Sequence, residues 1–343
     1  MEENKAVRNI LVVNVNWVGD VIFSIPVFKA LKKTYPQARI ACLAPSRVKE
    51  ILENHFCIDD IIPFDEKGRH QSFWSKLVLI FELRKRKFDI AFLLHRSLTR
   101  ALLVYLAGIP TRVGYDAKNR GFLLTHCVKP LPGVVHRLDH YLNVIESFGI
   151  PALDRTYDLQ ISSADNAFAE DLLRRLEIRR GDFTVIINPG GNWDLKRWPK
   201  EKFSALIDRL SSELRAKVIM AGAPKDVDLV NDIVRQAKQK PFILTGQTTL
   251  KQLSALMSKV SLVVSADSGP MHLAASVKTK VIGLFGPTRP EITGPRGKGQ
   301  AAIIQNDVAC NRSSCYYLEC PDNICMKSIS VDQVMDEIRK IRN

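Results

Sequence analysis

Short apolar segments alternate with helix-length segments along almost the whole chain, and this alternation constrains the fold more than any other feature. The strand candidates are residues 10–15, 40–44, 60–64 and 89–94, then 184–191, 217–222, 241–246, 262–267 and 280–286. Apolar residues at successive positions are typical of strands that are buried on both faces. Such strands, joined by helical crossovers, form parallel sheets that helices cover on each side. We therefore predict an α/β fold with two Rossmann-like parallel-sheet domains.

The two series of strands are separated by residues 149–160, GIPALDRTYDLQ, which have no periodicity and include a proline. A segment of this kind is typical of a connection between domains. The predicted parts are an N-terminal domain over 1–155, a C-terminal domain over 156–327 and a final helix over 328–343. We expect a loop from Pro290 to about Lys327, and a capping box of Ser330 and Gln333 at the final helix. That helix is expected to pack back on the N-terminal domain.

Charge and composition limit the choice of partners. The 343 residues include 50 Lys and Arg against 36 Asp and Glu, a formal net charge of +14. This excess favours nucleic acid, anionic lipid headgroups or phosphorylated substrates. Nucleic acid is disfavoured, because the chain has no recognition motif and no interleaved aromatic residues. The first apolar run, ILVVNV, is too short for a signal peptide or a membrane span, so a soluble, cytoplasmic protein is expected.

Four of the seven cysteines lie in one C-terminal segment at regular intervals: Cys310, Cys315, Cys320 and Cys325. Cytosolic thiols are kept reduced, so no disulfide framework is expected. The spacing differs from the CxxC pairs of structural zinc sites, although four thiolates could still bind one metal. Free thiols are the prediction, and a metal site is the alternative.

Ligands of open parallel sheets collect beyond the carboxyl ends of the strands, so the segments that follow strands are the candidates for a site. Asp20 follows the first strand and the turn residue Gly19. Its carboxylate could cap the next helix, or it could act as a general base that removes the proton of a sugar hydroxyl. The two roles are compatible.

The C-terminal half carries a larger group of signals. Gly190 and Gly191 follow a strand and could bring bare backbone amides close to a phosphate, while Lys196 could neutralise a diphosphate. The sequence Asp267-Ser268-Gly269 ends an apolar strand and begins a helix, which is typical of an anion site. His272 follows about one turn later. Each residue alone could have a structural role.

Together these segments resemble glycosyltransferase family 9, the ADP-heptose:lipopolysaccharide heptosyltransferases, along nearly the whole chain. The resemblance is carried by Gly19-Asp20, Ala107-Gly108-Ile109-Pro110 through Gly114-Tyr115, His136 with Asp139, Lys196 with Trp198-Pro199, Asp267-Ser268-Gly269 with His272, and Gly286-Pro287-Thr288. The cysteine-containing tail is similar to that of the second core heptosyltransferases.

The resemblance implies a GT-B fold, with two domains facing across a cleft, and an inverting transfer that needs no metal or other cofactor. Asp20 matches the family's proposed base. The implied donor site is Gly190, Gly191, Asn192, Lys196, Asp226, Thr248, Asp267, Ser268, Gly269 and His272. Of these, Asp226 and Thr248 could equally be helix caps. The implied acceptor side holds Arg96, Arg100, Arg112 and Arg120, which could instead be solvated surface charges.

The expected partners are an ADP-sugar donor and a phosphorylated Kdo-lipid A type acceptor, met by peripheral contact with the inner face of the cytoplasmic membrane. The named function is transfer of heptose to the lipopolysaccharide inner core. Two alternatives keep the fold. The first is a transferase of the same family that acts on another glycan or on a protein, and the second is a nucleotide-sugar epimerase. The sequence leaves the oligomeric state open.

Overall fold

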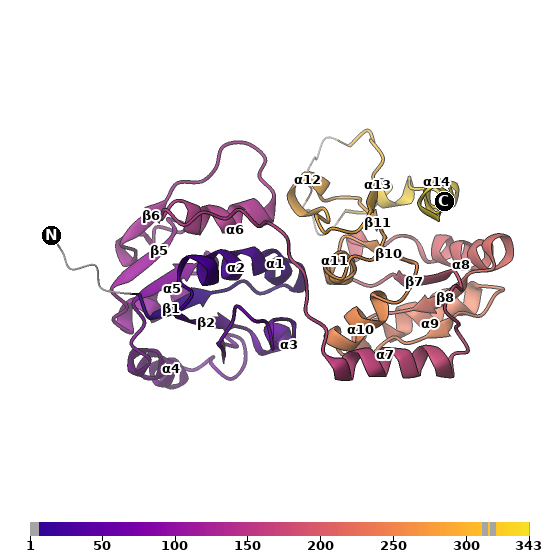
Figure 1. Ribbon diagram of the computed structural model, residues 1–343. Helices are drawn as coiled ribbons and strands as arrows, with labels where there is room; N and C mark the ends of the chain where they lie inside the picture. The colour runs from indigo at the N-terminus through magenta and orange to yellow at the C-terminus, as the bar shows by residue number, and fades with distance from the viewer. Residues whose placement is uncertain (1–6, 311–314, 316–319, 343) are drawn as a thin grey trace. The chain divides into compact units, whose positions relative to one another are not determined.

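The computed structural model describes residues 7–310, 315 and 320–342; residues 1–6 and 343, which the predicted domains include, lie outside them. The chain forms two compact units that divide between Tyr157 and Asp158. Residues 150–162 around this division have no helix or strand. Each unit contains a six-stranded parallel sheet flanked by helices (Figure 1). The predicted α/β class is therefore confirmed.

The sheet of the first unit has the strand order β3-β2-β1-β4-β5-β6. Its strands are β1 (Asn9–Val13), β2 (Arg39–Ala44), β3 (Asp60–Pro63), β4 (Ile90–Leu93), β5 (Thr111–Tyr115) and β6 (His126–Val128). The first four were predicted, whereas β5 and β6 were not. The central strands β1 and β4 are almost wholly buried, as their uninterrupted apolar sequence requires.

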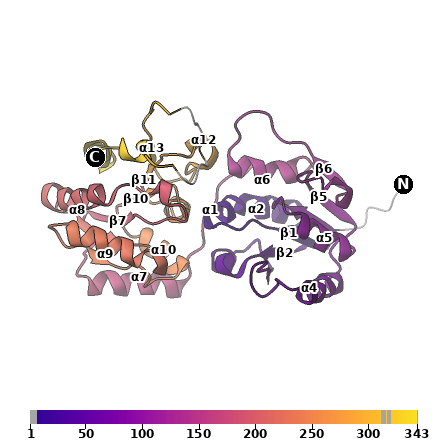
Figure 2. The same cartoon turned by 180° about the vertical axis from the view of Figure 1, so that it is seen from behind.

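Helices cover both faces of this first sheet (Figures 1 and 2). On one side α1 (Val18–Phe23) and α2 (Ile25–Thr34) contact α6 (Arg137–Glu146). On the other, α4 (Phe73–Lys85) and α5 (Leu98–Leu106) share a core with Leu11 and Val13 of β1. The shorter elements are η1 (Ser46–Val48), α3 (Lys49–Leu52) and η2 (Gly121–Leu123). Serine hydroxyls cap both α4 and α5, which fixes where these helices begin.

The sheet of the second unit has the order β12-β11-β10-β7-β8-β9. Its strands are β7 (Thr184–Asn188), β8 (Lys217–Met220), β9 (Phe242–Ile243), β10 (Leu262–Ala266), β11 (Val281–Leu284) and β12 (Ala301–Ile304). All but β12 were predicted. The expected loop from residue 290 to 327 also contains α12 (Pro290–Thr293) and α13 (Ile324–Lys327), so that expectation is corrected.

The helices of the second unit also form two groups. Residues of α8 (Lys200–Leu214), α9 (Val227–Gln236) and α14 (Val331–Arg342) share one core with the sheet. In the second group, α10 (Leu250–Met257) contacts both α7 (Ser163–Arg175) and α11 (Gly269–Ser276). The single-turn elements are η3 (Asp194–Lys196) and η4 (Pro224–Asp226). None of the helices in the described part of the chain has the length and apolar character needed to cross a membrane.

The final helix, α14, belongs to the second unit, so the prediction that it packs on the N-terminal domain is wrong. Val334, Met335, Ile338 and Ile341 form an apolar stripe that is buried in the core shared with α8. This stripe recurs at helical spacing and leaves the charged residues on the outer side. Burial of this apolar stripe against the core of the second unit removes it from water, which stabilises the helix in this position.

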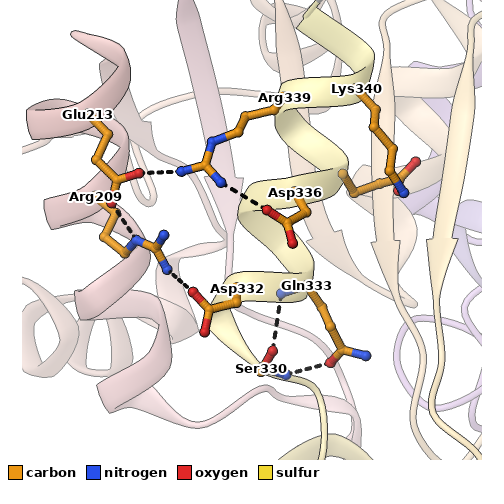
Figure 3. A network of polar contacts seen from close by, with 9 residues as sticks. Arg209, Glu213, Ser330, Asp332, Gln333, Asp336, Arg339 and Lys340 are labelled. Carbon is orange, nitrogen blue, oxygen red and sulfur yellow. Dashed lines mark hydrogen bonds and ion pairs between the residues drawn. The ribbon is translucent and has the colours of Figure 1, made fainter.

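Polar contacts at the rim of α14 agree with this placement (Figure 3). Asp332 pairs with Arg209 of α8 at 2.5 Å, and Arg339 pairs with Glu213 of the same helix at 2.5 Å. The predicted capping box is confirmed, because Ser330 Oγ accepts a hydrogen bond from the Gln333 backbone N–H at 3.1 Å, and Gln333 Oε1 accepts one from the Ser330 N–H at 2.8 Å.

Both sheets reverse their strand order once, and these switch points locate the candidate sites. In the first unit the reversal lies between β1 and β4, and in the second between β7 and β10. Loops that leave adjacent strands at such a point diverge to opposite faces and leave a crevice at the carboxyl edge. The segments after β1, β4, β7 and β10 therefore hold the residues with the best access to a ligand.

Candidate functional site

In the second unit, the turn after β7 is held against the start of α11. Asn188 is 1% exposed, and its Nδ2 donates to the Gly190 carbonyl at 3.2 Å and to Ser268 Oγ at 3.3 Å. A Cβ at Gly190 would lie 2.3 Å from the Asp226 carboxylate, and one at Gly191 would lie 3.9 Å from Ser268 Cβ. Glycine at 190 is thus required by close approach, and the turn lies between the loops that follow β8 and β10.

Lys196 and Asp267 meet at the same edge of the sheet. Lys196 Nζ lies 2.6 Å from Asp267 Oδ2, although they come from different connections. Asp267 is 5% exposed and also accepts a hydrogen bond from Thr288 Oγ1 at 2.7 Å. His272 Nε2 lies 4.0 Å from the other carboxylate oxygen. The predicted lysine, aspartate and histidine therefore form one cluster, in which Asp267 and His272 are buried and Lys196 is half-buried, and Thr288 contributes a hydroxyl.

The first turn of α11 presents backbone donors beside this cluster. Ser268 occupies the N-cap position in an extended conformation, and its side chain makes no capping bond. Its hydroxyl lies 3.1 Å from Ser265 Oγ and also receives the Asn188 amide bond. Gly269 begins the helix, whose N-terminus carries a partial positive charge from the aligned peptide dipoles. An anion placed here would meet N–H donors and the Lys196 ammonium together.

The loops after β8 and β9 hold two further predicted residues. Asp226 is 3% exposed, and its carboxylate accepts a hydrogen bond from the Ala223 N–H at 3.0 Å, which matches the helix-cap alternative. Thr248 is half-buried in the turn before α10, whose N-cap is the next residue, Thr249, so Thr248 itself is not the cap. Both lie on neighbouring loops, since the Gly246 N–H donates to the Gly222 carbonyl at 2.9 Å.

Two cations at the glycine turn were missed by the sequence analysis. Arg197 Nη2 donates to the Gly191 carbonyl at 3.1 Å and lies 3.7 Å from Asp226. Lys225 donates to the side chain of Asn192, which is exposed at the end of the turn. Both cations directly precede or follow a predicted site residue in the sequence. Their position after a strand was the available signal.

In the first unit, Asp20 is held by a tyrosine. Trp17 occupies the N-cap of α1, and Asp20 is the third residue of that helix, so the cap alternative for Asp20 is wrong. Tyr141, on α6, is 4% exposed and donates its hydroxyl hydrogen to Asp20 Oδ1 at 2.8 Å. Burial and the Asp20 charge raise the pKa of Tyr141 well above its usual value, so this group remains a donor. The sequence pattern did not indicate Tyr141 as a site residue.

Two of the predicted acceptor-side arginines are buried and hold loops of the first unit together. Arg100 is 1% exposed and donates to the Asn14 carbonyl and, at 2.6 Å, to Asn16 Oδ1. Arg120 is 0% exposed and donates to the carbonyls of His95, Ser97 and Tyr115 at 2.7, 2.9 and 3.0 Å. These contacts occupy several of their donors, whereas Arg100 Nε and Arg120 Nη2 have no hydrogen-bond partner among the described residues, so a direct role in acceptor binding stays a prediction. Both arginines link the loops that follow β1, β4 and β5.

Arg112 and Arg96 differ in how far contacts within the unit occupy their guanidinium groups. Arg112 Nε donates to the Leu123 carbonyl at 2.6 Å, and its guanidinium lies over the Tyr105 ring at 5.3 Å. Its predicted role in acceptor binding also stays a prediction. Arg96 is exposed after β4, with its guanidinium 5.4 Å from the centroid of the Tyr115 ring. Among the four predicted arginines, it is the one positioned at the surface for an incoming anion.

Burial and the nearby arginines keep two histidines uncharged. Burial and the charges of Arg100 and Arg120 lower the pKa of His95 to about 3. Burial and the charge of Arg96 lower the pKa of His140 to about 4. Both imidazoles are therefore neutral at physiological pH, and the positive charge at this edge comes from arginine.

All four cysteines of the C-terminal segment lie among the described residues. Cys310, Cys315, Cys320 and Cys325 are all free thiols. Within residues 7–310, 315 and 320–342, no group of three His, Cys, Asp or Glu side chains is arranged to hold a metal ion. Burial raises the pKa of the Cys325 thiol, which disfavours its thiolate form.

Comparison with known proteins identifies one family. The sequence profile of glycosyltransferase family 9 (heptosyltransferase) matches residues 77–319. The chain is 28% identical over 306 residues to lipopolysaccharide heptosyltransferase 2 of Salmonella typhimurium. The aligned region covers 83% of this chain and 85% of that protein.

Solved structures agree with the sequence match. A family 9 glycosyltransferase of Veillonella parvula superposes with a TM-score of 0.89 at 26% identity, covering 99% of this chain and 98% of that one. ADP-heptose lps heptosyltransferase II of E. coli superposes with a TM-score of 0.78 at 24% identity, covering 97% and 98%. These matches over both units confirm the predicted GT-B fold class.

Proposed function

The chain belongs to glycosyltransferase family 9, the heptosyltransferases, and from that premise we propose that it transfers heptose from ADP-L-glycero-D-manno-heptose to the inner core of lipopolysaccharide. The observation that carries the proposal is the cluster of Lys196, Asp267 and the N-terminus of α11 at the switch point of the second sheet. It combines a fixed cation with free backbone donors, which is the chemistry that a nucleotide diphosphate needs.

The donor is assigned to the second unit. Gly191 leaves room for a phosphate next to the backbone, whereas Gly190 accommodates the Asp226 carboxylate, and Lys196 supplies the charge. The half-buried Thr248 and the loop of Asp226 border the same edge and are proposed to line the adenosine pocket. The E. coli protein named above carries ADP-heptose in its name, which supports the choice of an adenine nucleotide.

The acceptor is assigned to the first unit because the edge of its sheet is positively charged. Arg100 and Arg120 are buried without an ion pair to a carboxylate in the described residues, and Arg96 is exposed beside them. A desolvated guanidinium attracts anions more strongly than a hydrated one, because the local dielectric is low. A phosphorylated Kdo-lipid A type acceptor has the complementary charge.

The proposed chemistry is a single displacement at the anomeric carbon. Asp20 takes the proton of the acceptor hydroxyl. At the same time the hydroxyl oxygen of the acceptor forms a bond to the anomeric carbon, on the face opposite the diphosphate. The bond from that carbon to the phosphate oxygen breaks, and ADP leaves with the electron pair. Lys196 and the N–H groups at Ser268 and Gly269 stabilise the charge that develops on the leaving group. The transfer inverts the anomeric configuration.

We also propose that no metal or other cofactor takes part. The charge that a metal would supply to the diphosphate is available from Lys196, with Arg197 and Lys225 at the neighbouring turn. Cationic side chains and helix dipoles can supply this stabilisation without a metal.

Donor selectivity tests the proposal. ADP-heptose and ADP are expected to raise the melting temperature of the protein, with or without EDTA, while UDP-sugars and GDP-sugars are not. Incubation with acceptor should then release ADP and form a heptosylated product. A preference for another nucleotide would overturn the named donor. Release of an altered sugar nucleotide without acceptor would favour the epimerase, and transfer to another glycan or to a protein would favour the alternative acceptor.

Tyr141→Phe tests whether Tyr141 positions the base. The substitution removes a hydrogen bond that stabilises the Asp20 carboxylate, so the acidic limb of the profile of kcat/KM against pH should move to higher pH. Tyr115→Phe is the matched control, since its hydroxyl donates to the His140 carbonyl at 2.7 Å, and it should leave the limb in place. An unchanged limb in Tyr141→Phe would show that the contact has no catalytic consequence.

A further inference from the structure

Helix α4 is apolar on both of its faces. Its inner face buries Leu79, Ile80 and Leu83 against the first sheet. The outer face exposes Phe73 (68%), Trp74 (74%), Val78 (68%) and Phe81 (57%). These four recur at helical spacing, so they form one stripe rather than scattered residues. An apolar helix face is normally covered, and the outer apolar face of α4 is open.

The neighbouring helix α5 has the same character. It buries Ala101, Leu103 and Val104, while an outer row of apolar side chains is exposed. That row consists of Leu98, Leu102, Tyr105 and Leu106. Helix α5 contacts both α4 and η2, and Phe122 of η2 is 78% exposed. We refer to the nine exposed side chains of α4, α5 and η2 as the apolar face.

Basic residues border the apolar face. The C-terminal end of α4 carries Arg84, Lys85 and Arg86, and Lys87 follows directly. The Arg84 side chain reaches Gly108, just beyond the end of α5. The acidic residue of α4, Glu82, is paired with Arg86 at 2.7 Å. The border therefore has an excess of positive charge next to an exposed apolar surface.

We propose that the apolar face binds the surface of an anionic lipid bilayer, with Trp74 and its neighbours inserted at the headgroup level. Aromatic side chains favour the interface between water and hydrocarbon, and Lys and Arg are attracted to anionic headgroups. A protein partner or a second copy would also cover apolar side chains, but the excess of basic residues on the border favours an anionic lipid. Exposed patches of this kind mark interaction sites.

The inference deepens the proposed function, because an acceptor that is anchored in a membrane has to be reached at the membrane surface. The apolar face and the exposed Arg96 belong to the same unit, and Arg96 lies two residues before α5. Docking through α4 and α5 would keep the unit that is proposed to bind the acceptor at the lipid surface. Lipid binding itself needs no transfer reaction, so the two proposals can fail separately.

Co-sedimentation with vesicles tests the proposal. We expect the full chain to sediment with phosphatidylglycerol vesicles, to bind phosphatidylcholine vesicles less, and to be released by salt. The double variant Trp74→Ser/Phe81→Ser should lose about tenfold or more in binding to phosphatidylglycerol vesicles. Leu153→Ser is the matched control, since Leu153 is 80% exposed outside the apolar face, and it should bind as the wild type does.

Three results would overturn the proposal: failure of the wild type to bind the vesicles, equal binding by the double variant, or a wild-type dimer that the double variant dissociates. Circular dichroism and donor-induced thermal shifts would show that the double variant is folded. Turnover with a deacylated, water-soluble acceptor should stay within about twofold of the wild type, because the altered residues are exposed side chains outside the proposed catalytic and donor-binding residues. Loss of transfer with this acceptor in the wild type would count against the proposed function and not against lipid binding.

Discussion

Asp20→Asn is expected to lower kcat by about 10²- to 10⁴-fold while leaving donor affinity close to that of the wild type. The amide is nearly isosteric and can still accept the Tyr141 hydrogen bond through its oxygen, but it cannot take a proton from the acceptor hydroxyl. Because the donor is assigned to the second unit, its binding should not depend on this side chain. Steady-state kinetics and calorimetry with ADP measure the two quantities.

A control for the loss of charge comes from the same unit. Asp139→Asn removes a carboxylate that pairs with Arg155 at 2.6 Å, and it should keep nearly full activity. If Asp20→Asn also keeps full turnover with normal donor binding, Asp20 is not the base, and another group must remove the proton.

Lys196→Met is expected to reduce kcat/KM by about 10²- to 10³-fold, with weaker binding of ADP. The substitution removes the proposed stabiliser of the leaving group. It also leaves the buried Asp267 carboxylate without its cation, so that a negative charge faces the diphosphate. Kinetics with saturating acceptor and calorimetry with ADP would separate the effects on rate and on affinity.

A double-mutant cycle sharpens this second test. Lys196→Met/Asp267→Asn should cost less than the sum of the two single changes, because the second change removes the unpaired charge left by the first. Lys200→Met is the control, since Lys200 pairs with Asp232 at 2.5 Å at the start of α8 and should leave kcat/KM unchanged. Equal activity of Lys196→Met and the wild type would rule out the proposed stabilisation.

Most of the strands that the sequence revealed are deeply buried, although β3 and β9 are only partly so. β1 and β10 are apolar at nearly every position, so each is recognised as one short continuous apolar run. β5, TRVGY, contains an arginine and a glycine, and β6 has three residues. β5 becomes a strand because it pairs with the edge of β4, and β6 because it pairs with β5, which are tertiary effects that a local pattern does not carry. The same holds for β12, which pairs with β11.

For the site, sequence position predicted proximity better than it predicted role. Lys196 and Asp267 were each selected because they follow a strand, and the parallel sheet brings them into contact. The arginines were selected by charge, and charge does not distinguish Arg120, which is wholly buried, from the exposed Arg96. Tyr141 lies inside an amphipathic helix, where a tyrosine on the buried side is indistinguishable from a core residue until its neighbour Asp20 is known.

The buried arginines keep a positive charge beside the loops after β4 and β5 that is constant over a wide range of pH. Burial lowers the pKa of Arg100 and of Arg120 only to about 10, and the neighbouring His140 takes up a proton only near pH 4. Between these limits neither guanidinium nor imidazole changes its charge. Acidification within this range would therefore leave the charge of these side chains, and their attraction for phosphate, unchanged.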